Sequence, residues 1–246
     1  MKAYAVIPAR LASTRLPKKA LLKDTGKFLV QHVYEQALLA EKIQKVIIAT
    51  DADEIVSAVK SFDGEVQLTS IDHQSGTDRI AEVAGREQAD IFVNVQGDEP
   101  EISPQAIDQV VSLLLENPNI EVATLAYPIS PEKALDPNLV KVVTDSKNAA
   151  LYFSRSPIPF IRDIAEKSIS PYLGHIGIYA YRKSFLNVYN SLEPSFLEKL
   201  EKLEQLRVLE NGYKIIVGKT SDNTRGIDTE EDYQKFVERF NKKCPT

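Results

Sequence analysis

Short apolar runs alternate with longer segments whose apolar residues recur at helical spacing in the first half of the chain. The short runs, which we expect to be strands, are AYAVIP (3–8), KVIIAT (45–50), EVQLT (65–69), DIFVNVQ (90–96) and EVATLAY (121–127). Because they are apolar almost throughout, they suit strands that are covered on both faces. The segments with helical spacing are 29–41, 53–62, 78–89 and 104–116. Strands that alternate with helices predict an α/β fold with a parallel, doubly wound sheet.

The pattern changes after about residue 128, where the chain becomes rich in proline as far as residue 171. We interpret this part, with short extended pieces at 139–143 and 149–154, as an insertion or lid region. The later elements are expected to be a strand at 175–181, helices at 182–191 and 196–211, a strand at 214–218 and a helix from 229. Ser103-Pro104 and the T-x-x-D of Thr229 and Asp232 are typical of helix starts. No repeat or linker marks a boundary, so residues 1–246 are predicted to form a single domain.

Composition and charge exclude several classes of protein. With 246 residues, 43% of them hydrophobic and 26% charged, the chain has the composition of an ordinary globular protein. Its net charge of -5 gives no general electrostatic reason to bind nucleic acid. The pattern of a signal peptide is absent from the N-terminus, and no 18-residue apolar segment occurs. We therefore expect a cytoplasmic protein without membrane insertion.

Cysteine and histidine are too scarce for most metal or disulfide chemistry. The single cysteine, Cys244, allows neither an internal disulfide nor a cysteine-rich zinc site. The chain has three histidines, His32, His73 and His175, so a site with several histidine ligands is not expected either. A bound metal would therefore meet carboxylates.

The N-terminal end of the chain is predicted to bind an anion. Six basic residues precede the first acid, Asp24: Lys2, Arg10, Arg15, Lys18, Lys19 and Lys23. Segment 7–21 follows the first strand, at the edge where open α/β sheets bind ligands, and Arg10, Arg15 and Lys19 supply cationic donors for phosphate. Neither G-x-x-x-x-G-K-[ST] nor G-x-G-x-x-G is present, which argues against a P-loop and a dinucleotide site. The alternative is a solvated basic loop.

Two acidic segments could hold Mg²⁺. In NVQGDEP (94–100), Asp98 and Glu99 follow an apolar strand, and carboxylate oxygens are ligands that Mg²⁺ accepts. Asp228, just before the last predicted helix, could join Asp98 around such a metal. Both have ordinary alternatives, because acidic turns are common after strands and an aspartate beside a helix N-terminus is favourable without a ligand.

The segment HQSGTDR (73–79) is a polar loop that enters a helix. Free N–H groups at the helix start, or the hydroxyls of Ser75 or Thr77, could hold a base or a phosphate. A helix cap without a ligand is the alternative.

Further polar candidates lie in the second half of the chain. Arg155 could bind a substrate carboxylate, and Glu204 and Gln205 could bind sugar hydroxyls. His175 lies in an apolar strand, where a structural role is the alternative, and a helical glutamate can equally be a solvated surface residue.

These segments together resemble the CMP-Kdo synthetase family, the 3-deoxy-manno-octulosonate (Kdo) cytidylyltransferases. The matching stretches occur in the order of the family across nearly the whole chain: IPARLASTRLPKK, ATD, DHQSGTDR, VNVQGDEP, VKVV, ALYFSRSPIPF, HIGIYAYR, LEKLEKLEQLRVLENGYKI and GIDTEED. The resemblance implies the nucleotide-diphospho-sugar transferase fold, a mixed, largely parallel sheet flanked by helices. It also implies a homodimer, with the insertion at about 128–181 used for dimerisation and for the acidic sugar.

The resemblance also implies residue roles. Arg10, Arg15 and Lys19 would bind the triphosphate of CTP, and Asp98 and Asp228 would ligate Mg²⁺. Residues implied to hold the nucleotide are Gln74, Ser75 and Gln96. Residues implied on the acidic-sugar side are Arg155, His175, Tyr179, Glu204 and Gln205. Lys19, Arg15, Asp98 and Asp228 are expected to carry catalysis.

Three positions depart from the family pattern. Lys18-Lys19-Ala20 replaces the usual Gly-Lys-Pro, Gly174 replaces a basic residue before the histidine, and Phe196 stands where a smaller residue or proline is frequent.

The reaction implied is attack of the anomeric hydroxyl of Kdo on the α-phosphorus of CTP, which gives CMP-Kdo and pyrophosphate for lipopolysaccharide precursor synthesis. One alternative is the same chemistry on a related acid sugar such as 8-amino-Kdo. Another is an inactive nucleotide-binding module, which would bind CTP without releasing pyrophosphate.

Overall fold

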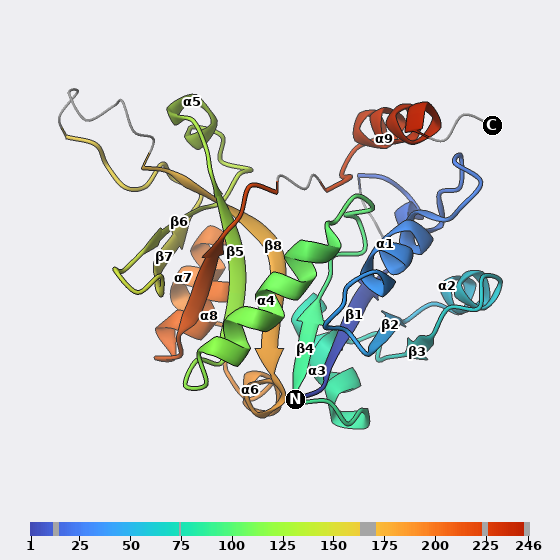
Figure 1. Ribbon diagram of the computed structural model, residues 1–246, viewed down its shortest axis with the longest axis horizontal. Helices are drawn as coiled ribbons and strands as arrows, with labels where there is room; N and C mark the ends of the chain where they lie inside the picture. Colours follow the sequence, from blue (N-terminus) through green and yellow to red (C-terminus); the bar gives the residue numbers. More distant parts are fainter. Residues whose placement is uncertain (12–14, 74, 163–170, 223–225, 244–246) are drawn as a thin grey trace. The chain divides into compact units, whose positions relative to one another are not determined.

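Residues 1–11, 15–73, 75–162, 171–222 and 226–243 are described by a computed structural model of the protein (Figure 1). The chain separates into two compact units, which are described in turn. Unit 1 consists of Met1–Asp108 with Thr224–Thr246, and unit 2 of Gln109–Asn223. The expectation of a single domain with an insertion at about 128–181 stays a prediction.

Unit 1 contains a parallel sheet with the strand order β3-β2-β1-β4 (Figure 1). Its strands are β1 (Ala3–Ala9), β2 (Lys45–Thr50), β3 (Val66–Leu68) and β4 (Ile91–Asn94). In the register of the sheet, Ala5 of β1 lies beside Val46 on one side and Val93 on the other. All four residues of β4 are buried, as its apolar sequence predicts. Because the strands are parallel, the loops that follow them meet at one edge of the sheet.

Helices join these strands by crossover connections. They are α1 (Leu29–Leu38), α2 (Asp53–Lys60) and α3 (Gly76–Arg86), with a short 3₁₀ turn η1 (Lys19–Leu21) before α1. The chain moves outward from β1 to β3 and then returns to β4, so right-handed crossovers put α3 on the face opposite α1 and α2. Helix α4 (Pro104–Glu116) begins at the predicted Ser103-Pro104 start and contains the boundary between the units.

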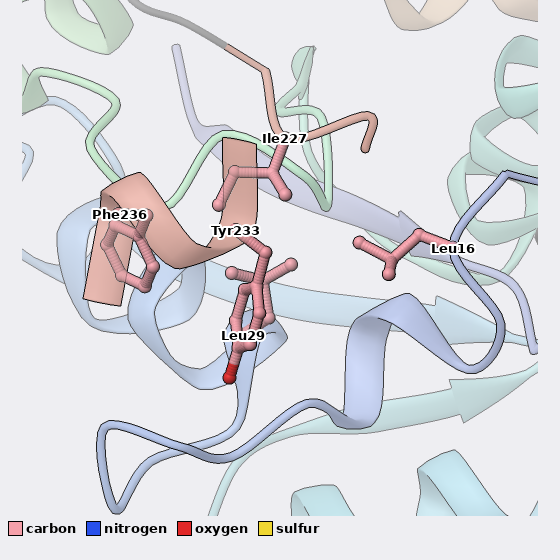
Figure 2. Packing of buried hydrophobic residues seen from close by; sticks show 5 residues of the cluster. All are labelled: Leu16, Leu29, Ile227, Tyr233 and Phe236. Carbon is pink, nitrogen blue, oxygen red and sulfur yellow. The ribbon is translucent and has the colours of Figure 1, made fainter. Parts of the chain in front are cut away.

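The C-terminal helix α9 (Glu230–Lys243) belongs to unit 1. Thr229 and Asp232 cap it reciprocally: Thr229 N–H donates to Asp232 Oδ2 at 3.0 Å, and Asp232 N–H donates to Thr229 Oγ1 at 3.2 Å. This confirms the predicted helix start. Figure 2 shows the apolar cluster that joins α9 and the segment before it to the N-terminal part of the chain. Its buried members are Leu16, Leu29, Ile227, Tyr233 and Phe236.

Unit 2 contains parallel and antiparallel strand pairs. Strand β5 (Val122–Pro128) is parallel to β9 (Ile215–Lys219) and antiparallel to β8 (Leu173–Arg182). The antiparallel hairpin of β6 (Lys141–Thr144) and β7 (Ala150–Ser154) pairs with β8 through β6. The helices of this unit are α5 (Pro131–Ala134), α6 (Lys183–Tyr189), α7 (Phe196–Glu201) and α8 (Gln205–Glu210). The two units confirm the predicted mixed, largely parallel α/β class.

One predicted element is wrong: the helix expected over 196–211 is two helices. Helix α7 ends at Glu201, and Lys202 then adopts the left-handed conformation with φ 55°. The guanidinium of Arg155 donates to the carbonyls of Glu201 at 2.7 Å and Lys202 at 3.5 Å, where a continuous helix would have used them. A tertiary contact thus ends a helix that the apolar spacing would continue.

None of the helices in the described ranges combines the length and hydropathy that a membrane span needs.

Candidate active site

Lys19 lies at the centre of a charged cluster in unit 1. Its ammonium donates to Asp98 Oδ2 at 2.6 Å and to the carbonyl of Ile227 at 2.7 Å, and it lies 3.4 Å from Asp228 Oδ1. Arg15 Nη2 lies 3.0 Å from the same oxygen of Asp228. Three stretches of the chain that were predicted separately as a phosphate loop and two metal-binding segments therefore meet at one place.

A tight turn positions Lys19. Lys18 has φ 53°, in the left-handed region, and its carbonyl accepts a hydrogen bond from the N–H of Leu21 at 2.8 Å. The 3₁₀ turn η1 therefore begins at Lys19 itself. Leu16, on the other side of the turn, is buried in the cluster of Figure 2 and fixes this loop to α9.

Close packing after β4 positions Asp98. A Cβ atom at Gly97 would lie 2.6 Å from the carbonyl oxygen of Pro8, so this approach of two backbones requires glycine. The carbonyl of Asp98 accepts a hydrogen bond from the N–H of Ile227 at 2.8 Å. Since Ile227 is anchored in the apolar cluster, its backbone holds Asp228 next to Asp98 (Figure 2).

The charged cluster opens into a cavity of about 290 Å³. The residues that line it are Pro8, Ala9, Arg10, Arg15, Lys19, Ala20, Gln96, Gly97, Asp98 and Asp228. The structure thus brings together six of the predicted site residues of this unit. Arg10 makes no ion pair with any residue in the described ranges. Glu99, the neighbour of Asp98, is buried and does not line the cavity.

The residues present fit Mg²⁺. Asp98 and Asp228 both interact with one ammonium group, which shows that their carboxylates can converge on a single cation. No cluster of three or more His, Cys, Asp or Glu side chains suited to a metal occurs in the described part of the chain. Two carboxylates are a donor set typical of Mg²⁺, which takes its remaining ligands from substrate phosphates and water. That these two aspartates ligate Mg²⁺ stays a prediction.

Ser75 caps helix α3. Asp78 N–H donates to Ser75 Oγ and Ser75 N–H donates to Asp78 Oδ2, both at 3.0 Å, which is a capping box. The alternative of a helix cap is therefore observed, although the hydroxyl hydrogen of Ser75 remains able to donate. The helix start lies beside the cavity, because a Cβ atom at Gly76 would lie 3.6 Å from Pro8 Cγ. Gln74 lies outside the described residues.

Unit 2 holds the residues predicted for the sugar side, and three of them are neighbours. The rings of His175 and Tyr179 are 5.2 Å apart between centroids. Burial raises the pKa of Tyr179 well above its ordinary value, and the negative charges of nearby groups, Glu204 among them, add to this increase. Burial lowers the pKa of His175 to about 3, so this ring is neutral near pH 7. His175 Nε2 lies 2.9 Å from Thr124 Oγ1, whose own hydrogen points to the carbonyl of Ile178 at 2.7 Å.

The side-chain hydrogen bonds of Arg155 are to backbone carbonyls, and Gln205 is buried. The donors of Arg155 bind the carbonyls of Glu201 at 2.7 Å and Pro137 at 3.0 Å. The carboxylate of Glu201 accepts hydrogen bonds from Arg155 N–H at 2.9 Å and from Ser154 Oγ at 2.6 Å. Gln205 is buried at the start of α8. Sugar-binding roles for both residues stay predictions.

One buried ion pair near the helix α3 loop was not among the predicted site residues. Arg79 has no exposed surface, and its Nη2 lies 2.6 Å from Asp51 Oδ2. The sequence offers a weak signal for it, because Arg79 belongs to the HQSGTDR segment and Asp51 directly follows β2.

Cations, two convergent carboxylates and a cavity at the carboxyl edge of a parallel sheet are the arrangement that a nucleotidyltransferase needs. The sequence profile described as Cytidylyltransferase matches residues 4–215. A protein of Geobacter sulfurreducens named 3-deoxy-manno-octulosonate cytidylyltransferase is 48% identical over 98% of this chain and 100% of its own length. A protein of the same name from Solibacter usitatus is 49% identical over 97% of this chain and 94% of its own length. The chain belongs to the 3-deoxy-manno-octulosonate cytidylyltransferase family.

Solved structures agree with this assignment. The structure of CMP:2-keto-3-deoxy-manno-octonic acid synthetase complexed with CTP matches with a TM-score of 0.94 and 43% identity, over 99% of this chain and 100% of that one. A cytidylyltransferase from Leptospira borgpetersenii matches with a TM-score of 0.64 at 19% identity, over 100% of this chain and 95% of that one, which shows a shared fold alone.

Proposed function

We propose that the protein transfers CMP from CTP to the anomeric hydroxyl of Kdo, releasing pyrophosphate and forming CMP-Kdo. The observation that carries this proposal is the convergence of Lys19 on Asp98, Asp228 and the carbonyl of Ile227 beside the cavity of unit 1. It supports the proposal, because a cationic group suited to phosphate and two carboxylates suited to a metal lie together beside one cavity. The family to which the chain belongs supports CTP as the nucleotide.

The cations of this site are suited to the charge of the leaving pyrophosphate. Arg15 and Lys19 are paired with Asp228 and Asp98 in the structure, so phosphate oxygens would take over these donors when CTP binds. Arg10 is ready to receive a phosphate without first breaking an ion pair in the described part of the chain. Reactions at phosphorus depend mainly on positioning and on electrostatic stabilisation, so no covalent nucleophile is needed.

Mg²⁺ would be held by Asp98 and Asp228, and it would neutralise phosphate charge and orient the α-phosphate toward the attacking hydroxyl. The two carboxylates are held close together by a backbone contact. The carbonyl of Asp98 accepts a hydrogen bond from the N–H of Ile227, the residue directly before Asp228. Lys19 bridges the same two carboxylates and so holds their negative charges together until the substrate enters.

On the sugar side, the proposal assigns hydrogen-bonding roles to His175, Tyr179 and Glu204 of unit 2. A neutral His175 can donate or accept a hydrogen bond, but it cannot neutralise a sugar carboxylate. Arg155 would have to release carbonyl partners in order to receive that carboxylate. The homodimer implied by the sequence resemblance belongs to this proposal as well.

The test is pyrophosphate release with CTP, Kdo and Mg²⁺. We expect steady turnover that depends on all three components. CTP binding without pyrophosphate release would instead indicate an inactive nucleotide-binding module.

Parallel reactions with 8-amino-Kdo and sialic acid test the acceptor, since Gly174 replaces a basic residue of the family. A Cβ atom at Gly174 would lie 2.8 Å from Ile129 Cγ2, so the space for a side chain is filled in this chain.

A further inference from the structure

The carboxylates of Asp98 and Asp228 have cationic partners within their own chain. Lys19 Nζ lies 2.6 Å from Asp98 Oδ2 and 3.4 Å from Asp228 Oδ1. Arg15 Nη2 lies 3.0 Å from the same oxygen of Asp228. The ammonium of Lys19 also donates to the carbonyl of Ile227 at 2.7 Å, so three oxygen atoms surround it. Carboxylate and carbonyl oxygens are ligands that divalent cations accept, so Lys19 binds the same atoms that a metal would need.

The pairing of Lys19 is less accessible to solvent than that of Arg15. The side chain of Lys19 is 16% exposed and that of Asp98 is 29% exposed, whereas that of Arg15 is 66% exposed. Water and salt screen charges that are partly buried less than they screen exposed charges. Lys19 is therefore the main counter-ion of the two carboxylates, and a metal ion that binds Asp98 has to compete with it.

The charge of the cavity also opposes a metal ion that arrives alone. Three basic residues and two acidic residues line the cavity, which leaves one positive charge: Arg10, Arg15 and Lys19 against Asp98 and Asp228. Such a lining repels a divalent cation and attracts a phosphate group. Phosphate that binds Lys19 and Arg15 changes this balance, because it supplies negative charge and releases both carboxylates from their partners.

We propose that Lys19 and the metal ion bind the pair of Asp98 and Asp228 alternately, so that the protein gains high affinity for a divalent cation when phosphate draws Lys19 away. The inference rests on the proposed function, in which these two aspartates hold the metal. A ligand that favours the released carboxylates raises the affinity for the metal, and by linkage the metal raises the affinity for that ligand by the same factor. Lys19 is thus an internal counter-ion that couples the two binding events.

The experiment measures binding of Mn²⁺, which accepts the same oxygen ligands as Mg²⁺ and is detected by electron paramagnetic resonance. The titrations contain neither nucleotide nor Kdo, so they do not depend on turnover. Four proteins are compared: the wild type, Lys19→Met, Lys18→Met, and Lys19→Met combined with Asp98→Asn. Lys18→Met is the matched control, because Lys18 is the neighbouring cation, pairs with Glu54 at 2.8 Å and does not line the cavity. Circular dichroism checks the fold of each variant.

We expect Lys19→Met to bind Mn²⁺ more tightly than the wild type by about tenfold, a factor typical of the coupling between two sites of one protein. Lys18→Met should keep the wild-type affinity, which separates a general loss of positive charge from loss of the internal counter-ion. The double variant should lose the gain, because the amide of asparagine supplies no anionic ligand. Its behaviour identifies where the additional affinity arises.

A second measurement uses the wild-type protein, with inorganic phosphate as the probe. Phosphate bound to Arg15 and Lys19 should raise the affinity for Mn²⁺ severalfold, and titrations without protein correct for the Mn²⁺ that phosphate binds by itself. The same phosphate should raise the affinity of Lys19→Met by a smaller factor, since the carboxylates of that variant are already released from the ammonium. The wild-type titration tests the inference whether or not Lys19→Met folds.

Several outcomes would overturn the inference. Equal affinity for Mn²⁺ in the wild type and a folded Lys19→Met would do so, as would an equal gain in Lys18→Met or a gain that persists in the double variant. If Lys19→Met does not fold, a wild-type affinity that phosphate leaves unchanged decides in the same sense. Absence of pyrophosphate release from CTP and Kdo would instead overturn the proposed function, and the Mn²⁺ titrations would still show whether Lys19 and the metal exclude each other.

Discussion

The charged cluster around Lys19 in unit 1 and the rings of His175 and Tyr179 in unit 2 differ in their electrostatic character. Lys19, Asp98 and Asp228 are charged, partly exposed and paired with one another. His175 and Tyr179 lie on strand β8; burial lowers the pKa of His175 and raises the pKa of Tyr179, so both are uncharged near pH 7. The first set interacts through charge, and the second through hydrogen bonds and shape.

This difference indicates how each region would respond to a ligand. In unit 1, substrate phosphates and a metal would exchange with ion pairs that already exist, so the charges need little additional desolvation when the substrate binds. In unit 2, a sugar hydroxyl would meet the uncharged rings of His175 and Tyr179, which it can bind without displacing a counter-ion. Substitutions should therefore affect catalysis most in unit 1, whereas their clearest effects in unit 2 should be on stability and on binding of the sugar.

The largest effect is expected for Asp98→Asn. An amide keeps the volume of the side chain but removes an anionic ligand, and a catalytic metal contributes several kcal/mol of charge stabilisation in the transition state. We expect kcat/KM to fall on the order of 1,000-fold. Circular dichroism should show an intact fold.

Glu101→Gln is the matched control for this change. Glu101 lies close in sequence and pairs with Arg239 at 2.5 Å, but it does not line the cavity. Its activity should stay near that of the wild type. Full turnover of Asp98→Asn at limiting Mg²⁺ would show that the metal assignment is wrong.

Lys19→Ala should have the next largest effect. Loss of a preorganised donor to developing charge typically lowers kcat by about 100-fold. Arg15→Ala should lower it by a smaller factor, on the order of tenfold, because the Arg15 side chain is 66% exposed and its charge is screened by solvent. Steady-state kinetics with CTP provide the measurement, and Lys18→Ala, which removes a neighbouring cation that binds Glu54, is the control. Unchanged kinetics in both site variants would place the phosphate site elsewhere.

The charged site of unit 1 could be predicted in part from the sequence because several of its residues lie close to the end or the start of a recognisable element. Arg10 follows β1, Asp98 follows β4, and Asp228 precedes the helix start of α9. Parallel strands bring their carboxyl ends to one edge, so the strand pattern alone places two of these segments together. The direct pairing of Lys19 with both aspartates could not be predicted, because it depends on the turn at Lys18 and on the backbone of Ile227.

The helices of unit 2 show that the spacing of apolar residues alone does not determine where a helix ends. The spacing of apolar residues over 196–211 fits one helix, and nothing local marks Lys202 as left-handed. The break depends on Arg155, which is distant in sequence and supplies donors to the carbonyls there. The burial of Arg79 escaped prediction for a related reason, since its partners Asp51 and Thr69 come from two other elements. Contacts between distant residues decide these features, and a local pattern does not contain them.

The pH dependence of stability tests the neutral state of His175. Its folded pKa, about 3, is below the ordinary value of 6.5, so between these values the unfolded chain binds a proton that the folded chain does not. This contribution to stability is present above pH 6.5 and is lost as the pH falls toward 3, by up to about 1.4 kcal/mol per pH unit. His175→Gln lacks this titration, so its free energy of unfolding should fall less than that of the wild type.

Urea unfolding of both proteins at pH 7.0, 6.0 and 5.0 provides the measurement. Between pH 7.0 and 5.0 the wild type should lose about 2 kcal/mol more than His175→Gln. Burial also lowers the pKa of His32, but this residue is common to both proteins and cancels in the difference. Parallel pH profiles for the two proteins would mean that His175 is exposed enough to be protonated in the folded state.

The smallest effect expected is a gain in stability from glycine at the left-handed lysines, which occur in both units before a predicted site residue. Lys18, with φ 53°, precedes Lys19, and Lys202, with φ 55°, comes shortly before Glu204. A side chain in this conformation costs about 1 kcal/mol, which glycine avoids. Lys18 also forms an exposed pair with Glu54 at 2.8 Å, worth less than about 1 kcal/mol.

We therefore expect Lys18→Gly and Lys202→Gly each to be more stable than the corresponding alanine variant by about 1 kcal/mol, as measured by urea unfolding at pH 7. The alanine variants are the matched controls, because they remove the same side chains without relieving the backbone. Glycine variants no more stable than the alanine variants would show that the fold does not impose the left-handed turn, and the account of how Lys19 is positioned would then fail.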